Sequence, residues 1–210
     1  MITKLGVLVS GSGSNLQSII DSIKRGEIRG ATIKVVISNK PDAYALERAK
    51  KENIPTEYID SKPFKGRREE YDQLVIEKLI EYGVTPENGL VIMAGYLRII
   101  SSIFIKKYTR KIVNIHPSLL PAFTGLEAQR QALEYGVKIT GCTVHFADEG
   151  LDTGPIIIQT ALPVQDNDTV ELLKERILKE EHRIYPEAIR LLVDGKYKID
   201  GRKVIFANKD

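Results

Sequence analysis

Cysteine is almost missing from this chain, since Cys142 is the only one among 210 residues. A single cysteine excludes a disulfide within the chain and is typical of a reducing compartment. Apolar runs are also short, well below the ~20 residues that a membrane-spanning helix needs. The first residues, Met1–Leu5, lack the apolar segment and small-residue cleavage site of a signal peptide. We therefore expect a cytoplasmic protein without a membrane partner.

Charge of one sign is not concentrated anywhere along the sequence. The 31 basic residues and 28 acidic residues are interspersed and give a net charge of +3. This pattern argues against a nucleic-acid partner, because such proteins gather Lys and Arg on one face. The small positive excess still favours an anionic substrate. A hydrophobic content of 42% is ordinary for a globular domain with a buried core.

Two kinds of catalytic motif are missing as well. No His and Cys spacing resembles a zinc site, so no metal is expected. There is no Gly-x-Ser-x-Gly nucleophile elbow. Cys142 is interpreted as a small core residue and His145 as a structural residue within a strand. His182 lies in an expected helix, where a surface position and a functional one are both open.

Short apolar runs that alternate with longer amphipathic stretches indicate one α/β domain over residues 1–210. The expected sheet is mostly parallel, twisted and Rossmann-like, with helices on both faces and a C-terminal hairpin at Asp200-Gly201. The run over 90–94 is the most apolar and should be central, while Pro186 should bend or split the last helix. Strands are expected over 5–9, 33–37, 55–59, 90–94, 112–115, 142–146 and 155–160, helices over 15–24, 43–51, 67–82, 101–108, 126–135 and 169–192, and the hairpin over 197–206.

The segment Ser10-Gly11-Ser12-Gly13-Ser14-Asn15 joins the first strand to the first helix. Glycines allow close approach to a ligand, and a helix N-terminus offers free N–H groups and a positive dipole end. This combination favours a monophosphate site. Leu16 replaces the third glycine of a dinucleotide fingerprint, and the P-loop lysine is missing. A tight turn before a capped helix is the structural alternative.

The segment Asn114-Ile115-His116-Pro117 ends the fifth expected strand. Asn114 and His116 are two residues apart, so they share one face of that strand. An amide can donate a hydrogen bond to a developing oxyanion and an imidazole can move a proton, which suits carbonyl chemistry. A buried, hydrogen-bonded histidine beside a turn asparagine is the alternative.

The loop from Asp148 to Pro155 carries three carboxylates within five positions. A carboxylate here could orient His116 and hold its ring in the protonated form. The alternative is a solvated acidic loop. In parallel sheets ligands bind beyond the carboxyl ends of the strands, so all three segments are expected at one edge.

Taken in order, these segments resemble the folate-dependent formyltransferases, and among them the glycinamide ribonucleotide transformylases of purine synthesis. The resemblance covers nearly the whole chain. Its pieces are Gly11–Leu16, Ala94–Ile99, Asn114–Pro121, Gly141–Phe146, Leu151–Pro155 and Glu181–Pro186.

The resemblance implies transfer of the formyl group of 10-formyltetrahydrofolate, as co-substrate, to the amine of glycinamide ribonucleotide. The implied division places phosphate binding in about residues 1–100, and catalysis and folate binding in about residues 101–210. The implied catalytic residues are Asn114, His116 and Asp152. The phosphoribosyl site would use Gly13, Ser14, Asn15, Leu178, Lys179, Glu180 and Glu181. The folate site would use Arg68, Leu97, Arg98, Ile99, Ile100, Asn114, Asp148, Glu149, Gly150, Leu151 and Asp152.

The sequence departs from the family at Gln129, where members often carry histidine in an Ala-His pair. Any role of that histidine therefore fails here. The alternatives are another formyltransferase, a formyltetrahydrofolate hydrolase, or a non-catalytic nucleotide-binding module. A methionyl-tRNA formyltransferase would need a further domain, and a hydrolase would usually carry an N-terminal regulatory domain. A monomer and a homodimer are both open.

Overall fold

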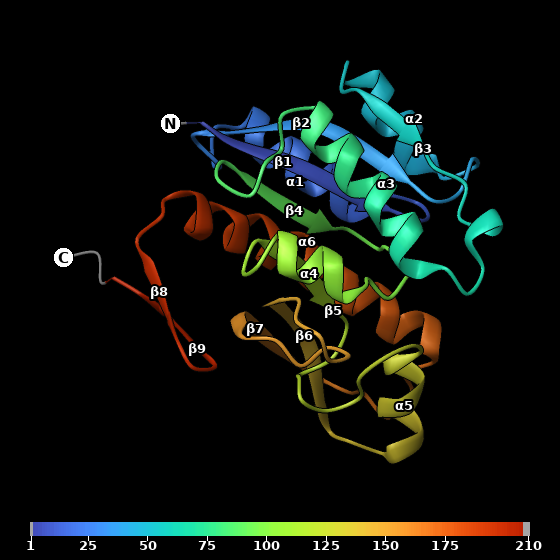
Figure 1. Ribbon diagram of the computed structural model, residues 1–210. Coiled ribbons are helices and arrows are strands. Elements are labelled where there is room, and N and C mark those ends of the chain that lie inside the picture. The colour runs from blue at the N-terminus through green and yellow to red at the C-terminus, as the bar shows by residue number, and fades with distance from the viewer. Residues whose placement is uncertain (1, 208–210) are drawn as a thin grey trace. The chain divides into compact units, whose positions relative to one another are not determined.

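Alternating strands and helices build an α/β fold on a mostly parallel sheet, which ends in an antiparallel hairpin (Figure 1). The structure is a computed structural model that describes residues 2–207. The chain forms two compact units, one up to Val113 and one from Asn114. These observations confirm the predicted fold class.

The first unit holds four parallel strands in the order β3-β2-β1-β4. In Figure 1, α3 lies in front of these strands and α1 lies behind them, so helices cover both faces. The elements of this unit are β1 (Thr3–Val9), α1 (Ser14–Lys24), β2 (Ala31–Ser38), α2 (Tyr44–Lys51), β3 (Thr56–Tyr58), the 3-10 helix η1 (Lys62–Phe64), α3 (Arg68–Glu81), β4 (Gly89–Met93) and α4 (Ser102–Lys107). Strand β5 (Ile112–His116) crosses into the second unit.

Strand β4 is buried at all five positions, as its apolar sequence predicts. It pairs with β1 on one side, and the Val91 N–H donates to the Lys111 carbonyl just before β5 on the other. A strand that is covered on both faces and paired at both edges has no position for a polar side chain. The central place expected for this strand is confirmed.

The second unit pairs β6 with β7 in antiparallel register, and β7 with β9 in parallel. The longest helix, α6, packs on β6 and β7 and buries nine of its side chains, Glu181 among them. The elements are α5 (Ala128–Tyr135), β6 (Ile139–Phe146), β7 (Ile156–Pro163), α6 (Val170–Val193), β8 (Tyr197–Asp200) and β9 (Lys203–Phe206).

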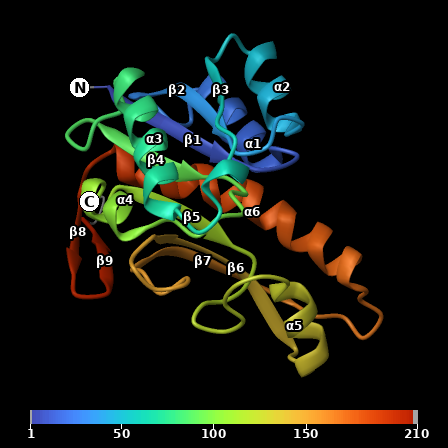
Figure 2. The ribbon, with the colours of Figure 1, turned by 45° about the vertical axis from the view of Figure 1, so that its right-hand side comes forward.

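Two sequence expectations need correction in this unit. Helix α6 is one continuous helix (Figure 2), so it is not split at Pro186, which is buried within it. Proline removes one N–H donor, and the packed neighbouring turns hold the helix together. The hairpin turn also lies one residue later than predicted, because Asp200 pairs with Lys203 and leaves Gly201-Arg202 as the turn.

Candidate active site

Asn114 and His116 project from the carboxyl-terminal half of β5. His116 is a buried residue with 5% of its surface exposed, and Asn114 is half-buried. Asn114 contacts His145 and His116 contacts Asp152, and His145 and Asp152 lie 3.7 Å apart, in keeping with the shared strand face of Asn114 and His116. The structure therefore brings together Asn114, His116 and Asp152.

The His116 ring is held at both nitrogens. Its Nε2 lies 2.8 Å from the Phe123 carbonyl oxygen, and its Nδ1 lies 3.4 Å from Asp152 Oδ2. A carbonyl only accepts, so Nε2 carries a hydrogen and donates it. Nδ1 then faces the carboxylate, which can accept a second hydrogen from a doubly protonated ring. The carbonyl and the carboxylate together fix the orientation of the ring.

Asp152 is held in an unusual backbone conformation. Its φ of 56° lies in the left-handed region, which costs energy for a residue with a side chain. Oδ2 of Asp152 accepts a 2.8 Å hydrogen bond from the Gly125 N–H. The neighbouring Gly154 is required for space, because a Cβ atom there would lie 1.8 Å from the Phe146 carbonyl oxygen. Crowding and strain in this loop thus serve to aim one carboxylate at His116.

The other two acidic residues of this loop, Asp148 and Glu149, differ from Asp152 in their surroundings. Asp148 Oδ1 accepts from the Thr153 hydroxyl at 2.6 Å and from the Gly150 N–H at 3.1 Å, which closes the loop. Glu149 and Leu151 are exposed. Of the three carboxylates, the structure places Asp152 next to His116.

His145, interpreted from sequence as structural, lies inside the same cluster. Its Nε2 is 3.3 Å from Asn114 Nδ2 and 3.7 Å from Asp152 Oδ1. Its other nitrogen, Nδ1, is 2.9 Å from the Phe146 carbonyl oxygen. Burial lowers the pKa of His145 below its ordinary value, so the ring is neutral near pH 7. The signal in the sequence is its place at the end of β6, just before the Asp148–Asp152 loop.

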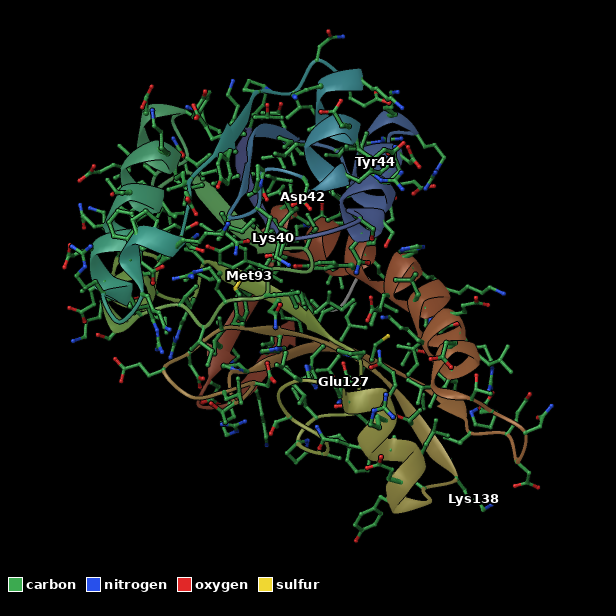
Figure 3. All side chains as sticks on the ribbon, turned by 90° about the vertical axis from the view of Figure 1, so that its right-hand side faces the viewer. Lys40, Asp42, Tyr44, Met93, Glu127 and Lys138 are labelled. Carbon is green, nitrogen blue, oxygen red and sulfur yellow. The ribbon has the colours of Figure 1, made fainter. Side chains whose placement is uncertain are left out.

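Two backbone groups of the loop after β5 were also not anticipated. The Phe123 carbonyl and the Gly125 N–H hold His116 and Asp152, respectively. The same loop leads to Glu127 at the N-terminal end of α5 (Figure 3). Main-chain groups carry no residue-type signature, so the sequence could not single them out. Gln129 is half-buried in the first turn of α5.

In the first unit, the glycine loop ends at Gly13, which precedes α1 with a φ of 72°. A Cβ atom at Gly13 would lie 2.6 Å from Ala45 Cβ, so α2 packs directly against this turn. Ser14 begins α1, and Asn15 is buried behind it. The glycine is thus needed for packing as well as for an open helix N-terminus.

The segment Leu97–Ile100 is fastened at both ends. The Leu97 N–H donates to Ser10 Oγ at 2.9 Å, and the Ser101 N–H donates to Asp72 Oδ2 at 2.5 Å. Between them the Arg98 guanidinium stacks on the Tyr71 ring at 4.2 Å. Leu97 and Ile99 are 62% and 57% exposed, respectively, and Ile100 is buried. Two exposed apolar side chains on a fixed backbone are suited to a flat heterocycle. Arg68, at the start of α3, is exposed.

The predicted α6 residues lie in the middle of that helix. Glu180 Oε2 accepts from Arg183 Nη2 at 2.8 Å, and Glu181 is buried. Leu178 is half-buried and Lys179 is exposed.

Burial and the nearby Glu181 raise the pKa of the Cys142 thiol, in keeping with a core residue.

Residues 2–207 contain neither a cluster of metal-binding side chains nor a membrane-spanning helix. No group of three or more His, Cys, Asp or Glu side chains is arranged to hold a metal ion there. Over the same residues, no helix is both long and apolar enough to cross a bilayer.

Known proteins resemble this chain along most of its length. The formyl transferase family model matches residues 3–189. Phosphoribosylglycinamide formyltransferase of Escherichia coli K12 is 43% identical over 193 residues, which cover 92% of this chain and 88% of that protein. The crystal structure of glycinamide ribonucleotide transformylase 1 from Symbiobacterium toebii is 50% identical, with a TM-score of 0.93 over 99% of this chain and 95% of that one.

Larger relatives match as well. The human trifunctional purine biosynthetic protein adenosine-3 is 44% identical over 196 residues, which are 93% of this chain and 19% of that protein. Across such trifunctional relatives the chain spans between 14% and 20% of their length. Because the family model covers residues 3–189, and a bacterial relative aligns over most of both chains, this chain belongs to the formyl transferase family.

Proposed function

We propose that the chain transfers the formyl group of 10-formyltetrahydrofolate to the amine of glycinamide ribonucleotide. The products are formylglycinamide ribonucleotide and tetrahydrofolate. The observation that carries this proposal is the buried contact of His116 with Asp152 beside Asn114, at the end of β5. The identity of the proposed substrate is taken from the names of relatives that align with this chain over most of both lengths.

Each member of the trio has a distinct role in this proposal. The neutral amine attacks the formyl carbon, and the carbonyl oxygen becomes an oxyanion. Asn114 donates an N–H to that oxyanion, an effect worth roughly 3 to 4 kcal/mol in comparable sites. His116, once its Nε2 turns from the Phe123 carbonyl toward the reacting atoms, relays a proton from the attacking nitrogen to the departing folate nitrogen as the old C–N bond breaks. Asp152 orients the His116 ring and stabilises the positive charge that develops on it during proton transfer.

The formyl donor is proposed to lie against exposed apolar surface and main-chain groups. Leu97 and Ile99 supply the exposed apolar side chains, and the stacked Arg98 keeps their backbone in place. Folate recognition is assigned to Arg68, Leu97, Arg98, Ile99, Ile100, Asn114, Asp148, Glu149, Gly150, Leu151 and Asp152.

The ribonucleotide phosphate is proposed to bind at the start of α1. The N–H groups of a first helical turn point along the helix axis, and together with the helix dipole they favour an anion there. The site is assigned to Gly13, Ser14, Asn15, Leu178, Lys179, Glu180 and Glu181.

We also propose that the enzyme works in the cytoplasm, as a monomer or a homodimer, on small molecules alone. The single cysteine and the interspersed charges support this setting.

An absorbance assay for loss of formyl-folate, with and without glycinamide ribonucleotide, tests the function. We expect turnover only when the amine acceptor is present. Turnover at an equal rate without acceptor would identify a hydrolase. No turnover with acceptor, together with nucleotide binding, would favour a non-catalytic binding module.

A further inference from the structure

His145 occupies a position that the reaction above leaves unexplained. Its side chain is 2% exposed at the end of β6, and it touches both Asn114 and Asp152. A buried ring that contacts an oxyanion donor can determine which way that donor points.

The hydrogen positions around His145 follow from its partners. The Phe146 carbonyl, 2.9 Å from Nδ1, can only accept, so Nδ1 carries the hydrogen. Burial lowers the pKa of His145, so near pH 7 the ring holds that single hydrogen and Nε2 is a bare acceptor. The Asn114 group that faces Nε2 at 3.3 Å must therefore be an N–H of its amide nitrogen. With its amide oxygen there, two acceptors would meet.

We propose that His145 is a positioning residue, which fixes the side-chain amide of Asn114 so that its second N–H points to the formyl oxygen. This inference rests on the proposed function. The two ends of an amide have nearly the same shape, so packing alone cannot choose between them. Without an acceptor at Nε2 the amide can turn over and present its oxygen to the developing oxyanion, which is repulsive.

Protonation of His145 would reverse this arrangement. Nε2 would become a donor, and Asp152 Oδ1 at 3.7 Å would be its nearest anionic acceptor. The charged and titratable groups that act on the ring are Asp152, His116 and Asp148. A charged His145 would thus turn the Asn114 amide and compete with His116 for Asp152. The neutral ring keeps both partners available for the reaction.

Two substitutions of His145 by amide residues test the roles of its two ring nitrogens separately. In His145→Asn, the shorter side chain can still donate to the Phe146 carbonyl, but it cannot reach Asn114. In His145→Gln, the longer side chain can place its oxygen near the position of Nε2 and accept from Asn114. We expect His145→Asn to lower kcat by about 10- to 100-fold, less than the ~10²–10³-fold cost of losing an oxyanion donor. KM values should stay within about twofold, and His145→Gln should recover most of kcat.

The substitutions His145→Asn and His145→Gln are then introduced into the Asn114→Ala variant. If His145 acts through Asn114, His145→Asn should add little to the loss already caused by Asn114→Ala. Full multiplication of the two losses, or equal activity of the Asn and Gln variants, would overturn the proposal. Ring ¹⁵N NMR of the unaltered enzyme gives a readout independent of activity and of variant folding. It should show the hydrogen on Nδ1, and a hydrogen on Nε2 would also overturn the proposal. Absence of formyl transfer in the unaltered enzyme would instead count against the function.

Discussion

At the scale of single residues, His116 and Asp152 should contribute to catalysis as one coupled unit. His116→Ala should lower kcat by ~10²–10⁴, the usual contribution of a positioned proton-transfer group. Asp152→Asn should also lower kcat, because the amide cannot stabilise a charged ring. The double variant should cost little more than His116→Ala alone. Steady-state kinetics of the two single variants and the double variant measure this coupling. If the two losses in kcat multiply fully, Asp152 does not act through His116.

The buried carboxyl of Asp72 should make the stability of the fold depend on pH. Its side chain is 1% exposed, and burial raises the pKa of its carboxyl above the ordinary value. The unfolded chain therefore ionises Asp72 more easily than the native one. The stabilisation by the protonated form is complete below the unfolded pKa of 3.8 and is lost as pH rises through the native pKa.

Asp72→Asn removes this titration while it keeps an oxygen acceptor for the Ser101 N–H. Urea unfolding of both proteins between pH 3.5 and pH 8 should show the wild type losing stability relative to the variant as pH rises. A constant difference across that range would mean that the Asp72 carboxyl has the same pKa in the native and the unfolded chain, and would contradict this account.

The sequence places Asn114 and His116 on one face of a strand, whereas Asp152 was singled out among three loop carboxylates by the family resemblance. Asn114 and His116 are two apart on one strand, and Asp152 follows in a glycine-containing loop. His145 was assigned a structural role because it lies within an expected strand, and its contact with Asn114 joins residues 31 apart, which leaves no local mark in the sequence. The Phe123 carbonyl and Gly125 N–H were not predictable, since any residue supplies such groups.

At the scale of elements, the start of α1 offers a test in which stability and binding change in opposite directions. Ser14→Asp places a negative charge in the first turn, where the helix dipole should stabilise the fold by about 0.3–1 kcal/mol. The same charge should repel a phosphate, so KM for glycinamide ribonucleotide should rise by about 10-fold or more, while KM for the folate stays within twofold. Ser18→Asp, one turn further along, is the matched control and should change neither KM. An unchanged ribonucleotide KM in Ser14→Asp would move the phosphate site elsewhere.

The loop before β7 makes a second prediction at this scale. In Gly154→Ala the new Cβ would lie 1.8 Å from the Phe146 carbonyl oxygen, so the loop that carries Asp152 must shift. We expect a stability loss of about 1–3 kcal/mol and a fall in kcat. Gly11→Ala is the control for stability, because a Cβ there meets nothing within 4 Å. Thermal melts that match the wild type for Gly154→Ala would show that the loop is not crowded.

Element positions followed closely from periodicity, and the exceptions have physical causes. The last helix was expected to bend or split at Pro186, but it does not split, and eight other buried side chains anchor it on both sides of the proline. Strand β6 begins at Ile139 rather than Cys142 because its first residues pair with Leu162 and Pro163 of β7. Such long-range pairing leaves no local mark in the sequence.

At the scale of the whole molecule, fold class came from the alternation of strands and helices, and the family came from motifs spread over most of the chain. Neither source shows where the formyl carbon goes. A ¹³C-formyl label on 10-formyltetrahydrofolate, followed by NMR in the presence of glycinamide ribonucleotide, measures this directly. We predict that the label appears in formylglycinamide ribonucleotide, one for each tetrahydrofolate released, and that His116→Ala slows this transfer by ~10²–10⁴. Label recovered as free formate, at the same rate with or without the ribonucleotide, would contradict the proposed transfer.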